Sequence, residues 1–236
     1  MIFKRGRKNP ESSAVDPQDA EADPASEPVV ADDDEEHVDS SDVDPRAGGP
    51  WDASEIKVPS DDASYIDLGG LIVKGRVGFD LQIPADDDTD ELAAVLFVTE
   101  DAAVEIRAFA ATRSGGLWDE VRAEIVEEVA RLEGAAEEVQ GAFGAELQLQ
   151  VPAETPDGQR AVQPSRIIGV EGPRWFLRGT FMGSAALNPR DDGVLESAFR
   201  DVVVVRGQDA MAPRDPLRIV LPDSAVVMGD DQSEDG

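Results

Sequence analysis

The most regular pattern of hydrophobic and polar positions lies in residues 113–134, where a glycine turn precedes apolar side chains spaced by three and four. These apolar positions form one stripe opposite a glutamate-rich face: Trp118, Val121, Ile125, Val129 and Leu132. Such a stripe is typical of an amphipathic helix that covers a sheet. Asp119 and Glu120 suit the positive N-terminal end of a helix, and Gly134 suits its C-terminal end. We therefore expect a helix over residues 117–133.

Strand-like patterns precede and follow this helix. Residues 92–99 are nearly all apolar and residues 102–111 alternate between apolar and polar positions, so the two segments are expected to form a hairpin. Further strand patterns, which alternate or are rich in β-branched residues, occur at residues 65–74, 75–84, 138–151, 166–170, 174–182, 202–206 and 217–221.

A second helix is predicted at residues 189–200, because Asn188 suits the N-cap and Pro189 the first helical position. Together the patterns predict an α+β fold, an antiparallel sheet of about six to eight strands with two helices packed on one face. The other face would then need a partner, a second copy of the chain or coverage by residues 211–221.

Composition divides the chain into three parts. Residues 1–60 form an acidic arm rich in Asp, Glu, Pro and Ser, and residues 223–236 form an acidic tail. Both are expected to be disordered because they cannot bury enough apolar surface to offset their ordering entropy. The α+β domain is expected at residues 61–222. The arm begins with a basic tip, Lys4, Arg5, Arg7 and Lys8, for which a weak contact with an anionic membrane surface remains open.

Charge and residue content restrict the function. The 236 residues carry a formal net charge of -30, which disfavours nucleic-acid binding. The chain has no cysteine and only one histidine, His37 in the acidic arm, so thiolate and imidazole chemistry are excluded from the domain. No apolar run reaches the length of about 18 residues typical of a membrane span, and no signal peptide is recognisable. We expect a cytoplasmic protein with neither a cofactor nor a metal site.

The best candidate for a binding site is the predicted strand at residues 174–182, where basic and aromatic side chains are interleaved. Arg174, Arg178 and Trp175 have the arrangement found in single-strand nucleic-acid binders, with aromatic platforms and cationic contacts. Arg206 and Arg214 join this ligand-binding site if the C-terminal segment packs beside the strand. Trp175 also suits a core position. No catalytic residue is predicted, because carboxylate pairs arise by chance among 51 acidic residues.

Four strings in this order resemble an actinobacterial family, domain-of-unknown-function family 3710: RSGGLWDEVRAEI, GPRWFLRG, FRDVVVVRG and MAPRDP. The resemblance covers roughly residues 60–222. It implies a cytoplasmic protein of a high-GC Gram-positive organism and carries no activity, cofactor or ligand.

The sequence thus favours a non-catalytic cytoplasmic interaction or adaptor protein, with a protein partner or a homo-oligomer as its expected assembly. The alternative is a small-ligand or nucleic-acid binder that uses the arginine and aromatic surface around Arg178. An enzyme that relies on carboxylates alone is the least favoured reading, because its acid–base groups must come entirely from Asp and Glu.

Overall fold

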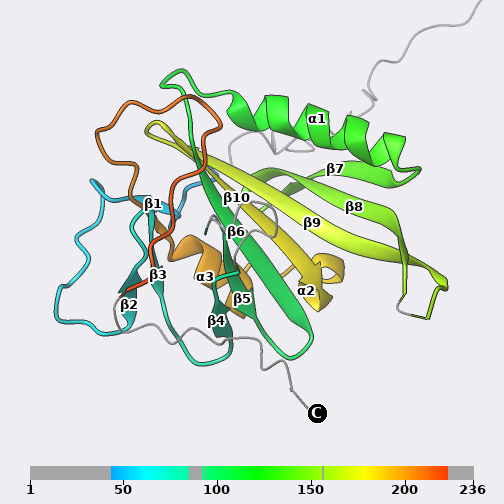
Figure 1. The fold of residues 1–236 in the computed structure, drawn as a ribbon, viewed down its shortest axis with the longest axis horizontal. Helices are drawn as coiled ribbons and strands as arrows, with labels where there is room; N and C mark the ends of the chain where they lie inside the picture. The colour runs from blue at the N-terminus through cyan, green and yellow to red at the C-terminus, as the bar shows by residue number, and fades with distance from the viewer. Residues whose placement is uncertain (1–43, 85–91, 93, 156, 223–236) are drawn as a thin grey trace, which may run out of the picture. The chain divides into compact units, whose positions relative to one another are not determined.

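The computed structural model describes residues 44–84, 92, 94–155 and 157–222 (Figure 1). The predicted acidic tail and residues 1–43 of the predicted arm, including its basic tip, lie outside the described residues. The described residues form an α+β structure, as the sequence predicts, with two sheets and three helices.

The larger sheet has seven strands in the order β4-β5-β6-β10-β9-β8-β7, and each neighbouring pair is antiparallel. Its strands are β4 (Asp80–Gln82), β5 (Val95–Val98), β6 (Ala102–Ala110), β7 (Ala135–Gly141), β8 (Gly144–Glu154), β9 (Arg160–Gly172) and β10 (Trp175–Gly183). The predicted β5–β6 hairpin is present. Residues 138–151 were expected to be one strand, but they contain the tight turn between β7 and β8. Gly144, with φ 86°, allows this turn, and Phe143 in it is buried.

A smaller, four-stranded sheet has the order β1-β11-β3-β2. Its strands are β1 (Trp51–Asp52), β2 (Tyr65–Asp67), β3 (Leu71–Lys74) and β11 (Val203–Val204). β1 pairs in parallel with β11, although it comes from the predicted acidic arm. The fold therefore includes residues before 61. The sequence did not predict this strand, because two residues in a polar segment leave almost no periodic signal.

The helix α1 (Leu117–Arg131) forms where the apolar stripe predicts it, and it packs over β7, β8 and β9 (Figure 1). Two shorter helices follow β10: α2 (Ser184–Leu187) and α3 (Val194–Arg200). The sequence predicted a single helix over residues 189–200, whereas α3 begins only at Val194.

The two predicted helices do not share a face of the sheet. Phe176 of β10 is buried in the apolar cluster beneath α1, while its neighbour Leu177 is buried in the cluster that includes Phe199 of α3. Successive strand residues point to opposite faces, so α1 and α3 lie on opposite sides of β10. The prediction of both helices on one face is therefore not confirmed. A central strand that is apolar on both sides needs cover on both.

The strand predicted at residues 217–221 does not form, and residues 211–221 instead contribute to the core. The Leu217 amide donates to the Ala108 carbonyl at 2.8 Å, and isolated bridges join Phe109 to Pro216 and Gly69 to Ile219. Leu217 and Ile219 are both buried on the α3 side. This segment thus extends the edge of β6 beyond β5 and links the two sheets.

Candidate functional site

Only two of the five predicted site residues line a common groove. Arg178 and Arg214 line one groove between α1 and the large sheet. Trp175 faces the opposite side of β10, where it is fully buried and its indole Nε1 donates to Asp52 Oδ2 at 2.8 Å. It is a core residue that ties β10 to β1.

Arg174 and Arg206 have a structural role outside the groove. The Arg174 guanidinium donates to the Gly207 carbonyl at 2.9 Å, and Arg206 Nε donates to the Arg174 carbonyl at 3.2 Å. Arg206 Nη1 also donates to the Asp209 carbonyl at 3.2 Å. These reciprocal contacts join the β9–β10 turn, where Arg174 has φ 64°, to the segment after β11.

The α1 groove has a volume of about 520 Å³. Its floor is a stacked aromatic pair, Phe109 of β6 and Phe176 of β10, with ring centroids 6.0 Å apart. It is lined by Phe109, Leu117, Val121, Glu124, Ile125, Glu128, Arg131, Phe176, Arg178 and Arg214. The helix α1 packs mainly over β7, β8 and β9. The groove lies where apolar side chains of α1 face β6 and β10 instead.

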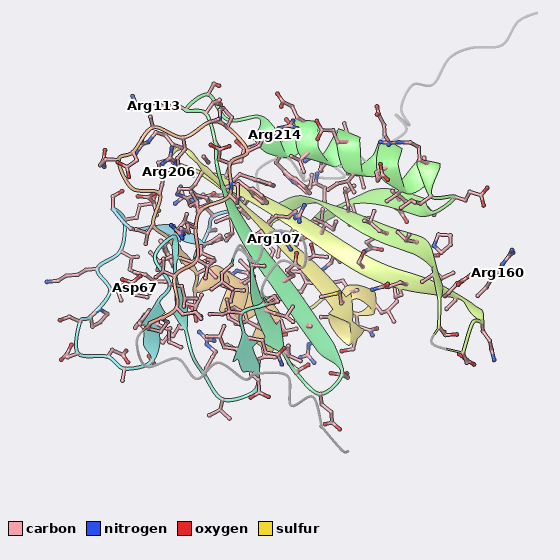
Figure 2. The ribbon with its side chains drawn as sticks, in the orientation of Figure 1. Asp67, Arg107, Arg113, Arg160, Arg206 and Arg214 are labelled. Carbon is pink, nitrogen blue, oxygen red and sulfur yellow. The ribbon has the colours of Figure 1, made fainter. Side chains whose placement is uncertain are left out.

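Arg214 joins the C-terminal segment to the N-terminal half of α1, as Figure 2 shows. Its guanidinium donates to both carboxylate oxygens of Glu124, at 2.8 and 3.0 Å, and to Glu120 Oε2 at 3.0 Å. Hydrogen bonds to Glu124 and Glu120 raise the pKa of Arg214. Its charge is therefore already balanced by two carboxylates.

Arg178 is less well paired. It lies directly opposite Arg107 on β6, and Glu105 is the nearest carboxylate to both. Glu105 accepts hydrogen bonds from Arg107 Nε at 2.8 Å and from Arg107 Nη2 at 3.4 Å. Arg178 Nη2 is 3.9 Å from Glu105 Oε1, beyond hydrogen-bonding distance. Burial lowers the pKa of Arg178, whereas the charge of Glu105 opposes this effect and that of Arg107 adds to it.

The carboxylate of Glu171 lies at the glycine turn before α1. Gly115 and Gly116 have φ 68° and 88°, and the Trp118 amide at the start of the helix donates to Glu171 Oε1 at 2.6 Å. The positive end of α1 is thus occupied by a side chain of β9. Gly169 on the same strand leaves room for the Trp118 ring, because a Cβ there would lie 2.2 Å from Trp118 Cδ2.

A buried ionic cluster on the α3 side was not predicted from the sequence. Arg166, Glu146 and Glu196 are 3%, 2% and 4% exposed. Arg166 Nη2 donates to Glu196 Oε1 at 2.5 Å, and its Nη1 is 3.7 Å from Glu146 Oε2. Burial raises the pKa of Glu146. The only sequence signal is a pair of glycines, Gly141 and Gly193, whose Cβ atoms would lie 2.2 and 2.1 Å from these carboxylates.

The two carboxylates of this cluster line different cavities of the described structure. Glu146 and Arg166 line a cavity of about 880 Å³ beside the β7–β8 turn, whereas Glu196 lines another of about 370 Å³ beside α2. Among the described residues, no group of three or more His, Cys, Asp and Glu side chains is arranged to hold a metal ion. In the same part of the chain, no helix is long and apolar enough to cross a membrane.

Comparisons with known proteins identify the family. No curated protein matches the sequence. Among solved structures, a crystal structure of a protein from Bacteroides thetaiotaomicron VPI-5482 is similar, with 15% identity and a TM-score of 0.37. That match covers 60% of this chain and 47% of the other, so the chain spans about half the length of that protein. The model of the family described as "Protein of unknown function (DUF3710)" matches residues 49–227. The chain therefore belongs to this family, as the four sequence strings suggested.

Proposed function

We propose that the protein is a non-catalytic ligand-binding protein of the actinobacterial cytoplasm, and that the α1 groove is its binding site. The observation that carries the proposal is a hollow of about 520 Å³ that is lined by five apolar side chains, Phe109 and Phe176 among them, and by five charged ones. Small-molecule sites typically have volumes of about 300 to 1,000 Å³ and mostly apolar walls. The groove thus favours small-ligand binding over the interaction or adaptor role that was the first expectation from the sequence.

Half-buried apolar side chains support this proposal. Val121 and Ile125 of α1 and Phe109 of β6 are all partly exposed on the walls of the groove. A ligand that covers them removes apolar surface from water, which stabilises the complex by about 25 cal/mol for each Å² buried. Phe109 is the partly exposed ring at the base of the groove, and it stacks on the buried Phe176, so a ligand packs against it without rearrangement of the sheet.

The chemistry of the lining supports a non-catalytic role. The described residues that line the groove include no serine, cysteine, histidine or lysine. Its cationic groups are all guanidinium groups, a type of group that does not exchange a proton readily in proteins. The glutamates at its rim, Glu124 and Glu128, are ion-paired with Arg214 and Arg131, respectively.

The test uses an uncharged fluorescent probe, N-phenyl-1-naphthylamine, with the full-length chain. Val121→Trp places a large ring in the groove, whereas Val126→Trp makes the same change on the exposed side of α1. We expect saturable binding to the wild type, binding at least about tenfold weaker in Val121→Trp, and wild-type binding in Val126→Trp. Absence of saturable binding to the wild type, or equal binding by a folded Val121→Trp variant, contradicts the proposal.

A further inference from the structure

We propose that the ligand of the α1 groove is an apolar monocarboxylate whose carboxylate is bound by Arg178. This inference rests on the proposed function and adds the chemical class of the ligand. It is carried by an imbalance of charge on the sheet beside the groove. Two guanidinium groups, those of Arg178 and Arg107, lie side by side, and Glu105 is the single carboxylate between them.

The Glu105 carboxylate is used mainly by Arg107. Arg107 donates to both Glu105 oxygens, whereas Arg178 lies 3.9 Å from the nearer one. Within the described part of the chain, Arg178 has no side-chain hydrogen bond of its own. The Arg178 guanidinium therefore keeps an uncompensated positive charge and free N–H donors in the groove, next to Phe109 and Phe176.

The position of Arg178 strengthens an interaction with an anion. Only 28% of its side chain is exposed, and its guanidinium carbon lies 5.7 Å from the centre of the Phe109 ring. An ion pair in such partly dry surroundings is screened less than one in open solvent. The planar guanidinium also presents parallel N–H donors that match the two oxygens of a carboxylate.

The other charges of the groove favour a ligand with a single negative charge. Arg214 is bound by Glu120 and Glu124, and Arg131 pairs with Glu128 at 2.8 Å. Two carboxylates already occupy Arg214, and Arg131 is 68% exposed, so solvent weakens an ion pair between it and a ligand. The glutamates on the α1 rim also repel further negative charge. A carboxylate at Arg178 places an apolar body along the aromatic floor and beneath α1, whereas a phosphate dianion is disfavoured.

The experiment measures displacement of N-phenyl-1-naphthylamine by four ligands that share a ten-carbon chain: decanoate, decanol, decylamine and decyl phosphate. We expect the wild type to bind decanoate at least about tenfold more tightly than decanol, the gain typical of a charge-assisted hydrogen-bonded pair. Decylamine and decyl phosphate are expected to bind more weakly than decanoate. Arg178→Gln should lose the preference for decanoate over decanol, a comparison made within the variant and therefore independent of its affinity for the probe.

The matched control is Arg160→Gln, which removes an exposed arginine at the far end of β9 (Figure 2) and should keep the preference. Arg178→Lys keeps the charge but lacks the two parallel donors, so an intermediate preference is expected. Equal binding of decanoate and decanol by the wild type overturns the inference, as does tighter binding of decyl phosphate or a preference retained in Arg178→Gln. If the uncharged probe binds in the groove without any carboxylate preference, only this inference fails. If the probe does not bind, the proposed function fails with it.

Discussion

Removal of the Glu196 carboxylate should strongly destabilise the protein, because it breaks the short ion pair of a buried arginine. Glu196→Ala leaves Arg166, 3% exposed, without its partner at 2.5 Å. Loss of one member of a buried ion pair typically costs about 3 to 5 kcal/mol, because the remaining charge stays out of water. Glu146 remains 3.7 Å from Arg166, so we expect a cost near the lower limit, about 3 kcal/mol.

Urea unfolding followed by circular dichroism measures this cost. The matched control is Asp192→Ala, which breaks an ion pair with Arg190 whose side chains are 70% and 80% exposed. That change should cost less than about 1 kcal/mol. A shift of the unfolding midpoint without a change in slope would report stability alone. If Glu196→Ala costs no more than Asp192→Ala, the ion pair is not buried, and the account of the α3-side cluster is wrong.

Two further predictions concern buried groups of the core. Burial raises the pKa of Glu146 above its unfolded value of 4.5, so its contribution to stability is present at low pH and is lost as pH rises through the folded pKa. Glu146→Gln should therefore reduce the fall in the urea midpoint as pH rises above the unfolded value, and a steeper fall would contradict this. Gly169→Ala places a Cβ 2.2 Å from Trp118 and 2.7 Å from Phe176, which should cost about 1 to 3 kcal/mol of unfolding free energy. Gly75→Ala, whose Cβ would be 3.6 Å from its nearest neighbour, serves as control, and equal costs would contradict the close packing.

Local patterns predicted the main elements well. The apolar stripe predicts a helix over residues 117–133, and α1 occupies Leu117–Arg131. Alternation likewise placed β6 and β10 within a residue or so of their observed ends. These elements bury side chains at regular spacing, so the spacing of apolar residues in the sequence predicts the type of element and its approximate ends. By contrast, β1 is two residues long, and no periodic pattern exists at that length.

Contacts between distant segments could not be predicted from local patterns. Trp175 and Phe176 are both buried, and only the packed fold shows that they face different helices. The groove was found in part, because Arg178 was a candidate from its strand. The uncompensated positive charge at Arg178, however, depends on Arg107, which lies opposite it on β6. That pairing is set by the register of the two strands. The cluster around Arg166 likewise combines β8, β9 and α3.

The groove is tested most directly by nuclear magnetic resonance of the isotope-labelled full-length chain during titration with decanoate. Ligand binding in the groove should shift the backbone amide signals of Phe109, Val121, Ile125 and Phe176 together, in a saturable manner, with Arg178 among the most affected. Shifts confined to the cavity beside the β7–β8 turn, or no saturable shifts, would contradict ligand binding between α1 and the sheet.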